Sequence, residues 1–480
     1  MPEDTKTSST SKSATQSKTS KRVGTAVRTL APMVPLAIAL AHGAMTSKAP
    51  TAPSTEQSTT ISSPAPSVLD CSASVPCPLV AAGHPVSWWF VFKLNAKVFP
   101  ECGGGTRTCP FGGTVQTTST YKEFGQQYVV ASSDSTQLQD GLTDCLGTTT
   151  KDPVGASFNE IYNGKFHYVI WNDQPYGDPK IAACTSSGNC DAPWGHSKGI
   201  LAWNDQGQGF VMQVSTPSWP ESGNPKFPRK TDGNTLGCVK DNDVTFSQHF
   251  FALMLNKDDL MLVLHGLANA SVVTDPSNVQ IVNNGGPSDV QAAVKELGKK
   301  STSEALVEGT LSTGILFISK PSNMNVPPWQ MVSSQLGGAS LRTATFWANP
   351  EIPSTETSDV PGCWNEALGT PGPVAIATTG SWRGKTFVLT GTPGGNHAKI
   401  GVTTSGDTSY SIFGDENQQG QLESDCKSSQ NGRGGTFYAL NNGDLTASIT
   451  QLIAGSTAPT ASTSKASTTS ETGTKETKKK

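Results

Sequence analysis

Short apolar runs, separated by segments rich in Gly, Pro and Asn, recur through the middle of the chain. Runs of four to eight residues with many aromatic and β-branched side chains predict buried strands. The strands predicted in this way are Ser87–Leu94, Tyr128–Ala131, His167–Trp171, Gly199–Trp203, Gly209–Val214, Leu260–His265, Gly314–Ser319, Val374–Thr379, Thr386–Thr390, Ile400–Thr403 and Tyr410–Phe413. Helical periodicity is clearest at Val290–Leu297 and Trp329–Leu336. The pattern therefore predicts a mixed α/β core.

The two ends of the chain lack this pattern. Residues 1–28 are rich in Ser, Thr and Lys and predict a disordered basic tail. Residues 29–45 predict a signal segment, because an apolar stretch follows basic residues and ends in an A-x-A-like sequence. An apolar patch in a disordered arm is the alternative. Residues 46–69 predict a Ser/Thr/Pro linker, and residues 456–480 a disordered Lys/Thr-rich tail. The apolar stretch is too short, and too interrupted by proline, to predict stable insertion in a membrane.

Composition narrows the class of protein. Of the 480 residues, 35% are apolar and 15% charged, which excludes a membrane bundle and a highly charged disordered chain. The 48 Gly and 32 Pro favour strands and long loops over a helical bundle. The net charge is −3 although both ends are basic, so the core is mildly acidic. A polyanion would therefore have to bind a local basic groove.

Ten cysteines indicate an oxidising compartment. Three pairs lie close in sequence: Cys71 and Cys77, Cys102 and Cys109, Cys184 and Cys190. This spacing suggests disulfides, although the sequence does not give their connectivity. With the signal segment, the cysteines predict an exported protein that is extracellular, periplasmic or lysosomal according to its source.

A His-x-Lys triplet occurs twice in matching surroundings, as His196-Ser197-Lys198 and His397-Ala398-Lys399. Each follows a Gly-containing turn, leads into a predicted strand, and is followed about 20 residues later by a polar residue, Ser215 or Asn417. The two histidines are 201 residues apart, about one domain length. A duplicated α/β unit explains this pattern, and it would bring two equivalent sites together at a pseudo-two-fold interface.

The residue types within the triplets suit the hydrolysis of a phosphodiester. Residues i and i+2 of a strand share a face, so each His and Lys would enter one pocket. Lysines can bind non-bridging oxygens and stabilise the transition state. One neutral imidazole can attack phosphorus, while the other, protonated, serves the leaving oxygen. Such a mechanism requires no metal ion. For each histidine taken singly, a structural role is the alternative.

The paired triplets resemble the phospholipase D superfamily, and the core more narrowly resembles the deoxyribonuclease II family. The stretches that carry the resemblance are WWFVFKL (88–94), WNDQP (171–175), GHSKGILAW (195–203), VSTPSWP (214–220), FISKPSN (317–323), PWQMVSSQLGGASLRTATFW (328–347), NHAKIGV (396–402) and FGDENQ (413–418). Their order along the chain is also that of the family. The resemblance extends over about residues 80–440.

The resemblance implies a fold, an activity and a site. The fold would be α/β, with two duplicated mixed-sheet halves, residues 70–245 and 246–455, in an intramolecular phospholipase-D-like pseudodimer. The activity would be metal-independent endonucleolytic cleavage of DNA, often best at acid pH, leaving 3′-phosphate ends. His196, Lys198, His397 and Lys399 would form the active site. DNA would be the substrate, and the protein would act as a monomer or a homodimer.

The sequence departs from the superfamily motif, which has an Asp seven residues after the His; Trp203 and Thr404 occupy those positions. The acids that orient the imidazoles are therefore open, and Asp173 and Asp415, each in a matching stretch, are the candidates. Turn acids are the alternative. The remaining supporting candidates are Asn204, Ser215 and Asn417.

Lys93 and Lys320 lie in matching segments and are candidates for contact with DNA phosphate, with solvated lysines as the alternative. The other histidines, His249 among them, show no partner pattern and are interpreted as structural. No nucleotide cofactor is indicated, because no P-loop or dinucleotide fingerprint occurs. Two alternative functions remain: a phosphodiesterase or phospholipase with another substrate, and a secreted DNA-binding or adhesive protein without catalysis.

Overall fold

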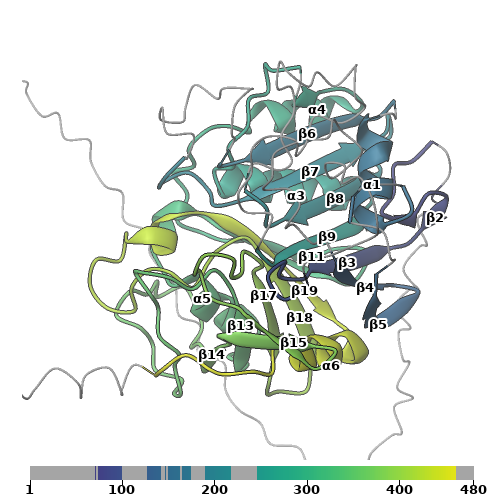
Figure 1. Cartoon of the computed structure of the whole chain (residues 1–480). Coiled ribbons are helices and arrows are strands. Elements are labelled where there is room, and N and C mark those ends of the chain that lie inside the picture. Colours follow the sequence, from purple (N-terminus) through teal and green to yellow (C-terminus); the bar gives the residue numbers. More distant parts are fainter. Residues whose placement is uncertain are drawn as a thin grey trace, which may run out of the picture. The chain divides into compact units, whose positions relative to one another are not determined.

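The computed structural model describes residues 71, 74–99, 127–141, 146–147, 150–162, 165–174, 190–217, 246–279 and 281–460 (Figure 1). All of them belong to one compact unit, Pro64–Lys480. The predicted N-terminal tail, signal segment and linker lie outside the described residues, as does the chain beyond residue 460. Residues 456–460, which the sequence assigned to the C-terminal tail, pair with the core through Ala377–Thr457 and Ser354–Thr460 bridges.

An eight-stranded sheet is built from the first part of the described chain (Figure 1). Its order is β10-β6-β7-β8-β9-β3-β4-β5, and every neighbouring pair is antiparallel. The strands are β3 (Trp88–Lys93), β4 (Tyr128–Ser132), β5 (Ser135–Asp140), β6 (His167–Asn172), β7 (Lys198–Trp203), β8 (Gly209–Val214), β9 (Gln248–Leu255) and β10 (Val282–Asn283). This sheet is antiparallel, where a mixed sheet was expected, and it extends past residue 245 to residue 283.

A seven-stranded sheet follows, in the order β11-β12-β19-β18-β17-β13-β14. Its strands are β11 (Val307–Thr310), β12 (Leu316–Lys320), β13 (Leu341–Ala344), β14 (Val374–Ile376), β17 (Ile400–Thr403), β18 (Tyr410–Gly414) and β19 (Gly435–Asn441). It is a mixed sheet, because β13 and β14 are parallel while its other neighbours are antiparallel. Two small hairpins, β1 (Leu79–Ala81) with β2 (His84–Pro85) and β15 (Thr379–Trp382) with β16 (Lys385–Val388), complete the described strands.

Helices are few among the described residues. They are α1 (Pro153–Tyr162), α3 (Lys257–Asn269), α4 (Ser288–Lys295), α5 (Pro328–Gln335) and α6 (Gly443–Leu452), with 3-10 turns η4 (Ser322–Met324) and η5 (Ser429–Gly432). The architecture is thus mixed α/β with several sheets. None of the described helices has the length and apolar character needed to cross a bilayer.

Both large sheets contain the same run of strands. The first has β6-β7-β8-β9-β3, and the second has β13-β17-β18-β19-β12. In each run the last strand in sequence is followed by a helix, α3 after β9 and α6 after β19. Each predicted His-x-Lys triplet directly precedes or begins the second strand of its run, β7 or β17. The triplets therefore occupy corresponding positions in the two sheets.

The predicted strand Leu260–His265 is wrong, because this segment lies inside helix α3. Its run of apolar residues fits either structure, and the local signals before it decide for the helix. Asn256 caps α3 by accepting from the backbone N–H of Asp259, whose side chain binds back to Asn256, forming a capping box. Buried Leu260, Val263, Leu264 and Leu267 then follow helical spacing. The sequence pattern also missed β9 and β19, which carry residues of the candidate site.

Two disulfides join described cysteines, Cys71–Cys77 and Cys363–Cys426, and Cys190 is also disulfide-bonded. The first of the three predicted close pairs is therefore confirmed. The pair Cys102 and Cys109 lies outside the described residues, as does Cys184. The bond between Cys363 and Cys426 spans 63 residues and was not anticipated.

Aromatic rings join the two sheets in the core. Phe413 of β18 stacks on Phe251 of β9 with ring centroids 4.1 Å apart, and it lies 4.6 Å from Phe90 of β3. All three side chains are fully buried. The contact between the sheets is therefore apolar at its centre.

Truncation of this contact should destabilise the whole unit. We expect Phe413→Ala to lower the free energy of unfolding by about 3–5 kcal/mol, because it removes a buried ring and leaves a cavity. Urea denaturation measures the change. Val388→Ala, at a side chain that is 41% exposed, is the control and should have little effect. A loss below about 1 kcal/mol for Phe413→Ala would show that the sheets are held together elsewhere.

Candidate active site

The histidine of the first triplet is held by hydrogen bonds through both its backbone and its ring. His196 is buried, and its backbone N–H donates to the carbonyl of Gly434, 2.8 Å away, just before β19. Its ring Nδ1 lies 2.7 Å from the backbone oxygen of Asp415, just after β18. A carbonyl can only accept, so Nδ1 carries the proton and the neutral ring presents a lone pair on Nε2. Both anchors come from the second sheet's part of the chain.

The lysine of the first triplet is held by a buried carboxylate. Lys198 begins β7, and its Nζ donates to Asp173 Oδ1 at 2.7 Å. The other oxygen of Asp173 accepts from Arg433 at 2.8 Å. Arg433 also donates to the carbonyls of Trp194, Cys190 and Gly195. Asp173 therefore orients an ammonium and a guanidinium, and not the imidazole that the sequence suggested for it.

The second triplet repeats the anchoring of the first. The backbone N–H of His397 donates to the carbonyl of Ser247, 2.8 Å away, just before β9. Lys399 Nζ donates to the His397 carbonyl at 2.6 Å. The ring of His397 lies against two phenyl rings, with centroid distances of 4.2 Å to Phe246 and 5.0 Å to Phe346. Its ring Nδ1 is 3.5 Å from Gln248 Nε2.

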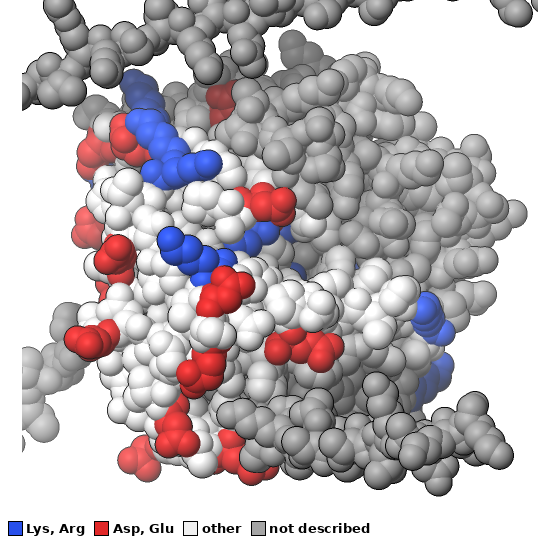
Figure 2. Space-filling view, turned by 90° about the vertical axis from the view of Figure 1, so that its left-hand side faces the viewer, with Lys and Arg blue, Asp and Glu red and all other residues white. Residues whose placement is uncertain are grey.

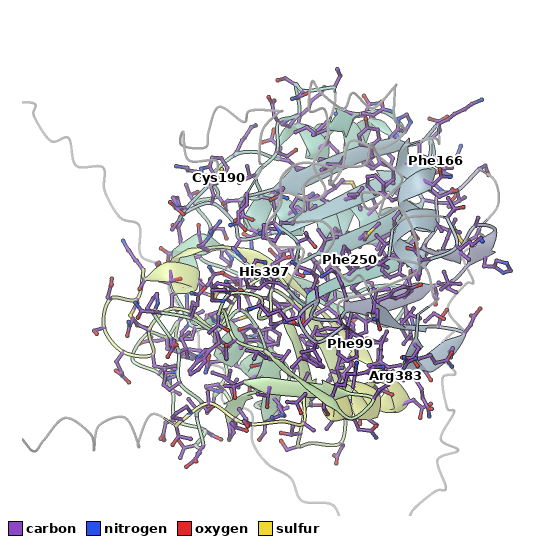
Figure 3. All side chains as sticks on the ribbon, in the orientation of Figure 1. Phe99, Phe166, Cys190, Phe250, Arg383 and His397 are labelled. Carbon is purple, nitrogen blue, oxygen red and sulfur yellow. A yellow bond between two sulfur atoms is a disulfide. The ribbon has the colours of Figure 1, made fainter. Side chains whose placement is uncertain are left out.

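The two triplets thus cross between the sheets. Each histidine N–H binds the carbonyl that immediately precedes the corresponding strand of the other sheet, β19 for His196 and β9 for His397. Position 434, which binds His196, requires glycine because the backbone passes close to Ala270. A Cβ on Gly434 would lie 2.3 Å from the carbonyl oxygen of Ala270. Figure 3 labels His397 where the strands of the two sheets meet.

The charges around the two histidines indicate that the triplets lie near each other. Burial lowers the pKa of His196 well below its usual range, and the Lys198, Lys399 and Arg433 charges lower it further. Burial also lowers the pKa of His397 well below its usual range, with Lys399, Lys198 and Lys93 acting in the same direction. Each imidazole therefore responds to the ammonium group of the other triplet. This mutual influence is what we expect if His196, Lys198, His397 and Lys399 line one candidate site.

A chain of buried hydrogen bonds connects the triplets behind the site. The Lys399 N–H donates to His249 Nδ1 at 3.1 Å, and His249 Nε2 lies 3.4 Å from Gln213 Oε1. Gln213 Nε2 donates to the Thr436 carbonyl at 3.0 Å. The Thr436 hydroxyl and N–H both donate to Asp415 Oδ2. Burial, with help from Lys399, lowers the pKa of His249 well below its usual range, which suits a neutral link.

The other predicted residues fall into two groups. Ser215 belongs to the site, because its Oγ donates to Gln248 Oε1 and accepts from the His249 N–H. Lys93 also belongs there, since its Nζ donates to the Phe246 carbonyl and its charge acts on His397. Asn204 lies beyond the opposite end of β7 from Lys198 and binds the backbone of the β7–β8 turn. Asn417 donates to Gln419 Oε1 within its own loop.

Lys320 occupies the position in β12 that Lys93 occupies in β3, but its surroundings differ. It is fully buried, and its Nζ donates to Glu416 Oε1 and to the carbonyls of Gln430, Asn431 and Arg433. Lys320 therefore stabilises the loop between β18 and β19. Trp88, Trp89 and Trp171 are core residues: all three are buried, and Trp171 Nε1 donates to Ser197 Oγ at 2.8 Å.

Two acids in the loop between β18 and β19 have raised pKa values. Burial raises the pKa of Asp415 to about 6, against the opposing hydrogen bonds from Thr436. Burial raises the pKa of Glu416 to about 7, although Lys320 opposes the shift. Both carboxyl groups therefore gain protons in mildly acid solution. The loop that carries the His196 partner is consequently less charged at acid pH than at neutral pH.

Comparison with known proteins identifies the family. The family model for deoxyribonuclease II matches residues 77–458. The chain belongs to the deoxyribonuclease II family. The resemblance read from the sequence is therefore confirmed.

Three curated relatives agree with this assignment. Deoxyribonuclease-2-alpha from Rattus norvegicus is 31% identical over 176 residues, which are 35% of this chain and 41% of the rat protein. The Bos taurus deoxyribonuclease-2-alpha is 31% identical over 167 residues, 33% of this chain and 38% of the bovine one. Deoxyribonuclease-2-beta from Mus musculus is 25% identical over 182 residues, 36% and 42% of the two chains. The matches span about two fifths of these relatives.

In this deoxyribonuclease II family member, Glu416 should make stability depend on pH. Its folded pKa is raised, so the stability it contributes is complete below about pH 4.5 and is lost as the pH rises through about 7. Within that window, the free energy of unfolding of the wild type should fall by up to about 1.4 kcal/mol per pH unit because of Glu416. We expect Glu416→Gln to abolish this fall. Urea midpoints of both proteins between pH 4.5 and 7.5 measure it. Exposed Glu296→Gln is the control. Parallel pH curves for wild type and Glu416→Gln would refute the assignment.

Proposed function

We propose that the protein is an endonuclease that hydrolyses DNA phosphodiester bonds through a phospho-histidine, without a metal ion, leaving 3′-phosphate ends. The observation that carries the proposal is the crossing of two His-x-Lys triplets, each histidine bound to the backbone of the other sheet. Two imidazoles and two ammonium groups acting on one phosphate would meet the needs of a phosphoryl transfer. Membership of the deoxyribonuclease II family supports DNA as the substrate.

The proposed fold is an intramolecular pseudodimer of phospholipase-D-like halves. The matching strand runs, the helix after each run, and the reciprocal backbone bonds at the triplets support it. Both triplets come from the same chain, so we propose that one chain holds a complete site. A homodimer of such units is equally compatible with this site.

The hydrogen bonds of the two rings support different roles in the reaction. His196 donates from Nδ1 to Asp415, so its Nε2 lone pair can attack phosphorus. The P–O5′ bond then breaks, and the 5′ oxygen takes a proton from His397. In the second step water attacks the phospho-histidine, His397 takes the proton, and the P–N bond breaks. Lys198 and Lys399 neutralise the charge that develops on the non-bridging oxygens.

Figure 2 shows Lys and Arg side chains interspersed with acidic side chains over the described part of one face. We propose that DNA binds at the candidate site itself, where Lys198, Lys399 and Lys93 supply positive charge for its phosphates. The disulfides support an oxidising compartment, so we propose that the protein is exported.

Separate removal of the two imidazoles tests the proposal. We expect His196→Ala and His397→Ala each to reduce plasmid cleavage in EDTA by about 10²–10⁴-fold. Exposed His84→Ala is the matched control and should cleave normally. Retained cleavage in either variant would refute the two-histidine site. Hydrolysis of a phospholipid, with plasmid left intact, would move the substrate from DNA to lipid.

A substrate with a sulfur atom in place of the bridging 5′ oxygen separates the roles. A thiolate leaves without a proton, so this substrate should restore the first chemical step in His397→Ala and not in His196→Ala. Rescue of His196→Ala in place of His397→Ala would reverse the assignment. End-group analysis of wild-type products should give 3′-phosphate, and 3′-hydroxyl ends would contradict the proposed bond cleavage.

The activity should rise as the pH falls below the usual imidazole range. The pKa of both histidines is lowered, so the protonated acid accumulates only below about pH 6.5. At still lower pH the nucleophile is protonated as well, and the rate falls. The expected profile of kcat/KM against pH is a bell whose two limbs lie on the acid side of neutrality. A flat profile between about pH 4 and 8 would contradict the mechanism.

A further inference from the structure

Gln248, the first residue of β9, connects the two halves of the site. It is buried; its Oε1 accepts from Ser215 Oγ at 2.7 Å, and its Nε2 lies 3.5 Å from His397 Nδ1. Ser215 Oγ also accepts the N–H of His249 at 2.8 Å. In this arrangement the Ser215 hydroxyl accepts from His249 and donates to the carbonyl end of Gln248, so the NH₂ end of the amide faces the imidazole.

This orientation determines the state of the ring. The NH₂ end of an amide can only donate, so His397 Nδ1 must be unprotonated, and the neutral ring carries its hydrogen on Nε2. A neutral imidazole is a very weak acid, because loss of its proton would leave an imidazolate. The arrangement is therefore a resting one, in which His397 cannot yet protonate a leaving oxygen.

The charges around His397 also oppose its protonation. Those that act on it among the described residues are the ammonium groups of Lys399 in its own triplet, Lys198 in β7 and Lys93 in β3. The rings of Phe246 and Phe346 form the neighbouring walls and bring no carboxylate. A neutral acceptor at Nδ1 is thus the local means of stabilising the imidazolium, and the carbonyl end of Gln248 can supply it.

We infer that the Gln248 amide rotates when His397 gains a proton, so that Oε1 accepts from Nδ1–H and Nε2 donates to Ser215 Oγ. The Ser215 hydroxyl can serve both orientations, because a hydroxyl group donates and accepts. The inference rests on the function proposed above and assigns Gln248 as a positioning residue that acts through His397. It couples the acid form of the site to one rotation of one side chain.

The rotated amide serves both chemical steps. With Nδ1–H held by Oε1, the acidic hydrogen of His397 is on Nε2. In the first step His196 forms its bond to phosphorus and the P–O5′ bond breaks. The 5′ oxygen takes the Nε2 hydrogen of His397 in that step. The ring is then neutral, keeps Nδ1–H, and presents a lone pair on Nε2. That lone pair takes a proton from water as the water oxygen binds phosphorus and the P–N bond breaks.

Gln248→Glu tests the inference through the pH profile. A carboxylate accepts in either orientation and is negative, so it should raise the pKa of His397 by about 1–3 units. We expect the alkaline limb of kcat/KM to move up by at least about one pH unit. Gln451→Glu places the same charge on an exposed position of α6 and should leave the limb unchanged. Gln248→Leu, which lacks an acceptor, should lower kcat with little change in KM.

An unchanged alkaline limb in a folded, active Gln248→Glu would overturn the inference and leave the endonuclease proposal intact. Loss of cleavage by the wild-type protein would instead overturn the proposed function. If Gln248→Glu does not fold, ¹⁵N NMR of histidine-labelled wild type decides, because protonated and unprotonated ring nitrogens resonate far apart. Above its pKa, His397 should be protonated on Nε2 and His196 on Nδ1. The same tautomer in both rings would contradict the role of Gln248.

Discussion

Two backbone hydrogen bonds determine the arrangement of the site. The N–H of His196 binds the Gly434 carbonyl, and the N–H of His397 binds the Ser247 carbonyl, so each triplet is fixed by the strand that enters the opposite sheet. Backbone bonds hold position more tightly than long side chains do, because they leave few dihedral angles free. The two triplets are consequently positioned where the sheets contact each other, a contact that also contains the stack of Phe251 on Phe413.

The symmetry of the backbone contrasts with the asymmetry of the side chains. Around the first triplet, Asp173 and Arg433 form a buried ionic group with Lys198. Around the second, Phe246 and Phe346 take the neighbouring space, and Lys399 binds a carbonyl. The Nδ1 partners differ as well, a carbonyl for His196 and an amide for His397. Matching strand runs can in this way place two identical residue types in different surroundings.

The sequence predicted the core of this site because its signal is local. The triplets, their glycines and the strands that follow lie within a few residues of each other. Strand β17 begins where the pattern placed it, and β7 begins one residue earlier than predicted. Gln248, Arg433 and the chain from His249 to Thr436 escaped prediction because their roles depend on contacts between residues more than a hundred positions apart. Likewise Asp173 lies in a matching stretch, yet only the fold shows that it holds Lys198 rather than an imidazole.

The account depends on both triplets acting on one phosphorus atom, and a crystal structure with bound orthovanadate tests this most directly. Vanadate adopts the five-coordinate geometry of a phosphoryl transfer. The account predicts vanadium bonded to His196 Nε2, an opposite oxygen facing His397 Nε2, and the remaining oxygens on Lys198 and Lys399. Vanadate held by the side chains of one triplet alone, or bound away from both, would contradict it.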